Sequence, residues 1–201
     1  MIKIVIFDLG RVLIDVDVDR CLNRFADEFH VSVPEILGNN DNRAHADFMV
    51  GKIDEEEFHR LTCQRFSQQV ELETLRAMWL TMLGQPKRDT IAVLAALVAQ
   101  NMPVALLSNV DPWHYQHCEE VIPEIRRIEK KYLSYLIKLK KPDLEIFNYV
   151  AADLKIPAEQ CLFVDDLLEN VEAANKIGMA TVHFRESEQL IHELQQHGIR
   201  V

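Results

Sequence analysis

The sequence predicts an α/β fold in which a Rossmann-like parallel sheet core carries an inserted helical cap. Short apolar runs alternate with amphipathic helical patterns over most of the chain, which is typical of a parallel sheet covered by helices. One long interval, residues 17–84, breaks this alternation because its patterns are helical throughout. With 201 residues, 48% of them hydrophobic, the chain is long enough to bury a full core beneath such a cap.

The core is expected to comprise residues 1–16 and 85–201. Its strands are predicted by four apolar runs, at residues 2–7, 103–107, 161–164 and 179–184. Its helices are predicted by amphipathic patterns at residues 88–101, 143–154, 168–177 and 186–197. Gly178 is expected to cap the end of one helix, and Pro142 with Asp143 to open another.

The cap is expected to comprise residues 17–84. Its helical segments are predicted at residues 19–29, 34–37, 44–50, 54–66 and 72–83. Asp54 is a candidate N-cap, with Glu57 completing a capping box. The core of the cap is expected to contain the larger side chains Phe66, Met78, Trp79 and Met82. An insertion after the first strand is expected to lie over the carboxyl ends of the strands, where open α/β sheets bind ligands.

Composition narrows the range of partners. The formal charge is 22 − 32 = −10, without any basic run, so nucleic acid and anionic membranes are not expected to bind. No apolar stretch approaches the roughly 20 residues of a membrane span, and a strand at residue 2 leaves no room for a signal peptide. The four cysteines form no Cys-x-x-Cys pair and are expected to be reduced, mostly buried thiols. We therefore expect a cytoplasmic protein, and the sequence does not indicate its oligomeric state.

Acidic residues end two of the predicted strands. Asp8 follows the first strand, and Asp165 and Asp166 follow the third. Parallel strands can place these carboxylates side by side, where they repel one another unless a cation lies among them. Carboxylate oxygens suit a hard divalent ion, and Mg²⁺ is the expected occupant. The alternative is that each acid only caps the turn or helix after it. For either strand end considered by itself, this alternative stays open.

Four motifs follow one another along the chain: Phe7-Asp8-Leu9-Gly10-Arg11-Val12, Leu106-Leu107-Ser108-Asn109, Lys141-Pro142-Asp143, and Val164-Asp165-Asp166 with Asn170. In order, spacing and cap placement the chain resembles the haloacid dehalogenase superfamily of aspartate-nucleophile hydrolases, in its phosphatase branch with a small helical cap. The segments Phe-Asp-Leu-Gly-x-Val-Leu, Tyr-Leu-Ser and Lys-Lys-Pro-Asp are also similar to bacterial alpha-D-glucose-1-phosphate phosphatase-like proteins.

This resemblance implies roles for the acidic residues. Asp8 would be the nucleophile, forming an aspartyl-phosphate that water later hydrolyses. Mg²⁺ would be held by Asp8, by Asp166 and by the backbone carbonyl of Gly10. Asp165 and Asn170 would support Asp166 and the waters bound to the metal.

The other motifs imply a phosphate-binding site. The hydroxyl of Ser108, the amide of Asn109 and nearby backbone N–H groups would face the phosphate oxygens. Lys141, held in an extended conformation by the proline after it, would neutralise the phosphate and Asp8 in the transition state.

Gly10 departs from the family pattern, in which a second Asp at this position protonates the leaving group. Asp15 or His45 could replace it, the substrate could have a good leaving group, or the protein could have little activity. Asp15, Asp17, Arg43 and His45 are candidates to face the substrate. His114, His117 and Cys118 are expected on a helix surface rather than in a metal site.

The sequence therefore predicts a Mg²⁺-dependent phosphomonoester hydrolase that acts on a small phosphorylated metabolite, with sugar phosphates as candidates. One alternative is a haloacid dehalogenase, which would release chloride without added metal. The other alternative is a catalytically weak phosphate-binding regulatory protein, which would bind phosphate or Mg²⁺ without turnover.

Overall fold

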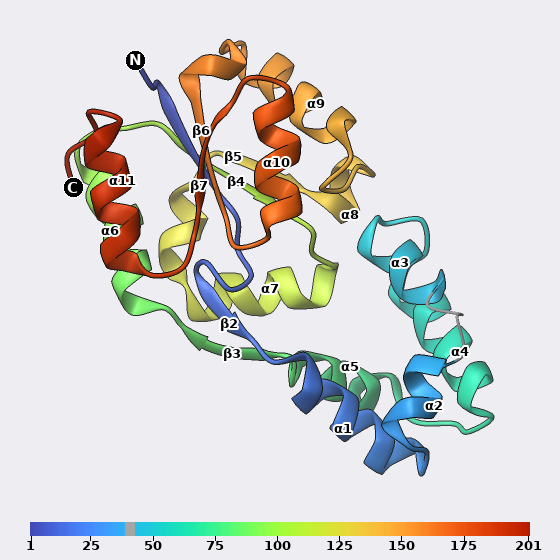
Figure 1. Ribbon diagram of the computed structural model, residues 1–201. Coiled ribbons are helices and arrows are strands. Elements are labelled where there is room, and N and C mark those ends of the chain that lie inside the picture. The colour runs from blue at the N-terminus through green and yellow to red at the C-terminus, as the bar shows by residue number, and fades with distance from the viewer. Residues whose placement is uncertain (39–42) are drawn as a thin grey trace.

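Five parallel strands form the central sheet of the computed structural model, which describes residues 1–38 and 43–201 (Figure 1). In sheet order they are β5 (Lys130–Leu133), β4 (Val104–Ser108), β1 (Ile4–Phe7), β6 (Cys161–Asp165) and β7 (Ala180–His183). This architecture confirms the prediction of an α/β fold with a parallel sheet. The edge strand β5 was not predicted, because its two lysines hide it among polar residues.

Helices cover both faces of the sheet. One face carries α6 (Arg88–Ala99) and α11 (Ser187–Gln196), and the other carries α9 (Leu144–Leu154) and α10 (Leu168–Lys176) (Figure 1). Side chains alternate along β1, so that Val5 and Phe7 enter one core cluster while Ile4 and Ile6 enter the other. Burial on both faces explains why the central strands are apolar at every position.

The helical insertion lies between two short strands. Its helices are α1 (Val18–Phe29), α2 (Val33–Gly38), α3 (Arg43–Met49), α4 (Glu55–Phe66) and α5 (Leu72–Leu80). The flanking strands β2 (Ile14–Val16) and β3 (Leu83–Pro86) pair antiparallel, so the chain enters and leaves the insertion through one narrow ribbon. This ribbon was not predicted. The division into domains at residues 17 and 84 stays a prediction.

The helices of the insertion pack around their own aromatic cluster. Phe25, Phe48, Phe58, Met78 and Trp79 are buried in it. The predicted N-cap at Asp54 is present, since its carboxylate accepts a hydrogen bond of 2.9 Å from the Glu57 backbone N–H. The Glu57 side chain instead pairs with Arg60, so only half of the expected capping box forms.

The core helix α7 (Pro112–Val121) completes this cluster from the other side. Its Trp113 is buried among the aromatic rings of the insertion. His114 and Cys118 are buried as well, so the prediction that they lie on a helix surface was wrong. Helix α7 packs against the sheet core on one side and against the insertion on the other. The prediction failed because the mixed polarity of this helix does not reveal in the sequence that both sides are covered.

The far end of the insertion contacts the core at α8 (Ser134–Ile137). The Ser134 hydroxyl donates a hydrogen bond of 2.6 Å to the carbonyl of Met49, at the end of α3. Gly51 lies directly against Tyr135, and a Cβ at position 51 would be 2.0 Å from the Tyr135 carbonyl oxygen. The insertion is therefore anchored at its tip as well as at the ribbon.

The remaining regular elements are two short 3₁₀ helices, η1 (Pro123–Arg127) and η2 (Ala158–Gln160). Gly178, with a φ of 91°, ends α10 as predicted. Among the described residues, no helix is both long and apolar enough to span a membrane. All four cysteines are buried free thiols, as expected.

Candidate active site

Three carboxylates meet at the carboxyl ends of β1 and β6. Phe7 pairs with Val164 across the two strands, so the acids that follow them, Asp8 and Asp165, leave the sheet side by side. Asp8, Asp165 and Asp166 each place one oxygen within 4.8 Å of the others. The clustering expected from the two strand ends is therefore confirmed.

Lys141 joins two of these carboxylates. Its ammonium nitrogen lies 2.9 Å from Asp8 Oδ1 and 2.6 Å from Asp165 Oδ2, and it also donates to the Leu107 carbonyl at 3.0 Å. Its side chain is almost completely buried. Lys141 therefore lies beside the acids, as the sequence implied, and its positive charge is shared between Asp8 and Asp165.

Asn109 holds the backbone of Lys141 in place. Its side-chain NH₂ donates to the Lys141 carbonyl, and its oxygen accepts from the Lys141 N–H, both at 2.8 Å. The amide expected to face phosphate is therefore already engaged. The sequence could not reveal this pairing because the two residues are 32 positions apart.

Asp165 and Asn170 belong to the same network. Asp165 Oδ1 accepts hydrogen bonds from the Leu167 N–H at 2.8 Å and from the Asn170 amide at 2.9 Å. Both residues were expected to support Asp166. Their contacts instead fix Asp165 against Lys141.

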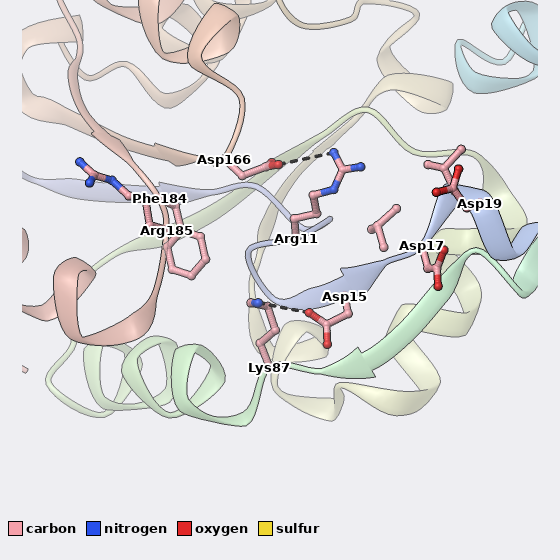
Figure 2. Close-up of a pocket in the computed structure, with 10 residues that line it drawn as sticks. Arg11, Asp15, Asp17, Asp19, Lys87, Asp166, Phe184 and Arg185 are labelled. Carbon is pink, nitrogen blue, oxygen red and sulfur yellow. Dashed lines mark hydrogen bonds and ion pairs between the residues drawn. The ribbon is translucent and has the colours of Figure 1, made fainter.

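Asp166 stands apart from this network and pairs with Arg11. The guanidinium nitrogen of Arg11 lies 3.6 Å from Asp166 Oδ2 (Figure 2). The backbone of Arg11 has a φ of 55°, which is uncommon for a residue with a side chain. No role was predicted for Arg11. Its position directly after Gly10, where the family pattern has an acid, is the sequence signal that could have suggested one.

The electrostatics of the cluster show an excess of negative charge. Burial raises the pKa of Asp8 to about 6, although the Lys141 charge opposes this and Asp165 reinforces it. Burial, together with Asp165, also raises the pKa of Asp166. Burial lowers the pKa of Lys141, but Asp8 and Asp165 outweigh it, so the net shift is upward.

These residues fit a hard divalent cation. Oδ1 of Asp8 is buried, and within the described part of the chain it has no hydrogen-bond donor beyond its ion pair with Lys141 at 2.9 Å. A divalent ion would satisfy such oxygens, and it would offset both the burial of these carboxylates and their mutual repulsion. Asp8 and Asp166 could hold Mg²⁺ together with the carbonyl of Gly10, which lines the same cavity.

Two adjoining cavities receive the site residues. The smaller, of about 170 Å³, is lined by Asp8, Gly10, Arg11, Val16, Ser108, Asn109, Lys141, Asp166, Leu167 and Asn170. The larger, of about 700 Å³, lies toward the insertion and contains Asp15, Asp17, Asp19, Lys87 and Arg185 among its lining residues (Figure 2). The residues predicted to attack, to bind phosphate and to hold the metal therefore all line the smaller cavity: Asp8, Gly10, Ser108, Asn109, Lys141 and Asp166.

The candidates for a substitute acid lie in different places. Asp15 lines the larger cavity, where it pairs with Lys87 at 3.2 Å. His45 packs edge-on against Trp79 in the insertion, where burial lowers its pKa. Neither His45 nor Arg43 is among the described residues that line the two cavities. Asp15 and Asp17 thus remain candidates to face the substrate.

A buried carboxylate after the central strand, an acid pair on the neighbouring strand and a buried lysine lie together at one edge of the sheet. A family model described as haloacid dehalogenase-like hydrolase matches residues 2–178. Because the match covers most of the chain, the protein belongs to this family of hydrolases.

Characterised relatives extend over nearly the whole chain. A D-ribitol-5-phosphate phosphatase from Bacteroides thetaiotaomicron is 26% identical, with 90% of this chain and 91% of the relative covered. A sesquiterpene phosphatase from Aspergillus oryzae, astK, is 28% identical, with 96% and 95% covered. Among solved structures, a HAD family enzyme from Bacteroides thetaiotaomicron in complex with magnesium and inorganic phosphate has a TM-score of 0.84 at 26% identity, with 96% and 99% covered.

Proposed function

We propose that the protein is a Mg²⁺-dependent phosphomonoester hydrolase that acts on a small phosphorylated metabolite through an aspartyl-phosphate on Asp8. The observation that carries the proposal is the arrangement of Asp8, which ends the central strand beside Lys141 and opens into a cavity shared with Asp166. The phosphatase relatives and the magnesium and phosphate in the solved relative support it.

The first step transfers the phosphoryl group to Asp8. A carboxylate oxygen of Asp8 forms a bond to phosphorus while the bond from phosphorus to the leaving oxygen breaks. Bound Mg²⁺ supplies charge neutralisation that lets one anion approach another. In the second step water attacks the phosphorus, releases inorganic phosphate and restores Asp8.

The residues around Asp8 bind and orient the phosphoryl group. Lys141 offsets the negative charge of Asp8 and of the transition state. Asn109 fixes the position of Lys141, and the hydroxyl of Ser108 is placed in the same cavity to contact phosphate oxygens. Asp165 keeps the Lys141 ammonium beside Asp8.

The larger cavity is where the leaving group would lie. Its lining is rich in charged and polar side chains, including Asp15, Asp17 and Lys87, which can exchange hydrogen bonds with hydroxyl groups. This lining favours sugar and polyol phosphates, with α-D-glucose 1-phosphate and ribitol 5-phosphate as the first candidates. A cytoplasmic location is consistent with four free, buried thiols.

A panel of phosphorylated metabolites tests the proposal. Purified protein is incubated with each compound in Mg²⁺ and in EDTA, and released inorganic phosphate is measured. We expect Mg²⁺-dependent release from at least one sugar or polyol phosphate, abolished by EDTA. Chloride release from a 2-haloacid without metal would favour the dehalogenase alternative. Phosphate or Mg²⁺ binding without turnover on any compound would favour the regulatory alternative.

A further inference from the structure

The two cavities meet where the leaving oxygen would depart. In the proposed function, the phosphoryl group occupies the smaller cavity beside Asp8 and the rest of the substrate occupies the larger one. The scissile bond therefore lies at their junction. The residues that line both cavities are Arg11, Val16 and Asp166.

Arg11 has the one side chain of these three that can stabilise a departing oxygen. The negative charge that develops there would be repelled by Asp166, and Val16 offers no polar group. A guanidinium provides up to five N–H donors and a permanent positive charge. Figure 2 shows the Arg11 guanidinium turned toward the carboxylate of Asp166.

The neighbouring cations are placed for other tasks. Lys141 is held between Asp8 and Asp165. Lys87 pairs with Asp15 on the wall of the larger cavity. Arg185 lines that cavity too, but its guanidinium points away from Arg11 (Figure 2). Among the described lining residues, Arg11 is thus the cation that lies at the junction.

The pairing of Arg11 with Asp166 is loose. At 3.6 Å it is longer than a strong charge-assisted hydrogen bond, and 47% of the Arg11 side chain is exposed. The Asp166 side chain is more buried, at 16% exposed, but a long pair with one partner half in solvent contributes little to stability. The guanidinium can therefore exchange partners at small cost.

The backbone keeps Arg11 at this position. The Arg11 N–H donates a hydrogen bond of 2.7 Å to the Ile14 carbonyl, closing the loop that starts at Asp8. The left-handed φ of 55° persists because the surrounding loop holds it. The Cα of Arg11 is therefore fixed directly after Gly10, while its long side chain remains free to turn.

From these contacts we infer that Arg11 is a catalytic residue that stabilises the leaving-group oxygen, in place of the acid that Gly10 cannot provide. The inference rests on the proposed phosphatase function. Arg11 pairs with Asp166 at 3.6 Å. A Mg²⁺ ion held by that carboxylate would compete for its oxygens and leave the guanidinium to face the leaving oxygen. The oxygen keeps the electron pair of the broken bond to phosphorus and takes its proton from water, because a guanidinium does not give up its own.

The kinetic test compares leaving groups. We expect Arg11→Gln to lower kcat/KM on the order of 100-fold for alkyl phosphates, the scale for removal of one stabilising donor, and far less for 4-nitrophenyl phosphate. Arg11→Lys should restore part of the loss. Arg185→Gln, which removes the same charge from the wall of the larger cavity, should leave the dependence on leaving-group pKa unchanged.

The binding test measures Mg²⁺ affinity by calorimetry without substrate. Arg11→Gln should bind Mg²⁺ about fivefold more tightly or better, because a cation close to Asp166 has been removed. Arg185→Gln should change the affinity much less. Equal or weaker Mg²⁺ binding by Arg11→Gln would overturn the exchange of partners at Asp166.

The outcomes separate the two proposals. A wild-type protein without turnover on any phosphate ester rejects the proposed function and the role of Arg11 with it. A wild-type protein with steady turnover, whose Arg11→Gln variant loses activity equally on all substrates or not at all, rejects the role of Arg11 alone.

Discussion

The indole N–H of Trp79 donates a hydrogen bond of 2.9 Å to the buried carboxylate of Asp111, and this bond ties the helical insertion to the core. His114 completes the contact, with Nδ1 2.7 Å from Asp111 and Nε2 3.0 Å from the Trp79 carbonyl. Both ring nitrogens face acceptors, so the imidazole satisfies both of them only in its protonated form.

This contact predicts a pH-dependent stability. Burial lowers the pKa of His114, but the charge and hydrogen bond of Asp111 outweigh it and raise the pKa above its ordinary value of 6.5. A raised folded-state pKa gives stability that is fully present below the unfolded-state pKa and is lost as pH rises through the folded-state pKa. We expect His114→Gln to lower the free energy of unfolding by about 3 kcal/mol near pH 6 and by less near pH 9. Urea unfolding at both pH values measures this difference, and an equal deficit at both would contradict it.

The contact of Gly51 with Tyr135 predicts that the tip of the insertion can be detached. Gly51→Ala places a Cβ 2.0 Å from the Tyr135 carbonyl oxygen at a φ of 62°. We expect a loss of about 2–3 kcal/mol in the free energy of unfolding and faster hydrogen exchange in α8. Gly178→Ala is the control, because its φ of 91° is also strained but, apart from its chain neighbours, no described residue lies within 4 Å of the added Cβ. Similar losses for both variants would show that backbone strain, and not the contact, is responsible.

The acid pair predicts two different effects of mutation. Asp166→Ala should weaken Mg²⁺ binding strongly, since it removes a proposed ligand, whereas Asn170→Ala removes only a hydrogen bond to Asp165. Calorimetric Mg²⁺ titration of both variants measures the ranking. Equal affinities would show that Asp166 is not a ligand.

The ion pair of Lys141 predicts a shift in the titration of Asp8. The Lys141 charge lowers the pKa of Asp8 against the effect of burial, and the balance is a pKa of about 6. In metal-free Lys141→Met, which keeps the length of the side chain, this lowering is lost and the pKa of Asp8 should rise above 6. Carboxyl NMR titration follows it directly, with the more exposed Lys138→Met as the control. An unchanged or lower pKa would show that the ammonium does not act on Asp8.

The grouping of Asp8, Asp165 and Asp166 could be predicted from the sequence because apolar runs mark the strands and the carboxyl ends of parallel strands meet at one edge. The contacts that refine the site could not be predicted in this way. Asn109 and Lys141 meet only because the end of β4 lies beside the start of α9.

Other parts of the fold lacked a sequence signal of their own. The strand β5 lies at the sheet edge with its lysines exposed or half-buried, and β2 has only three residues, so neither produces a clear apolar run. His114 resembles a surface histidine until Asp111 and Trp79 are placed around it. These features depend on tertiary contacts, and the local periodicity of the sequence does not encode such contacts.

The measurement that tests the central claim most directly is the turnover of Asp8→Asn on the best phosphate ester, in saturating Mg²⁺, with folding checked by circular dichroism. The amide is nearly isosteric with the carboxylate but cannot form the aspartyl-phosphate, so we expect a loss of about 1,000-fold or more with the fold intact. A folded Asp8→Asn variant that retains more than a few per cent of wild-type turnover would contradict the assignment of Asp8 as the nucleophile.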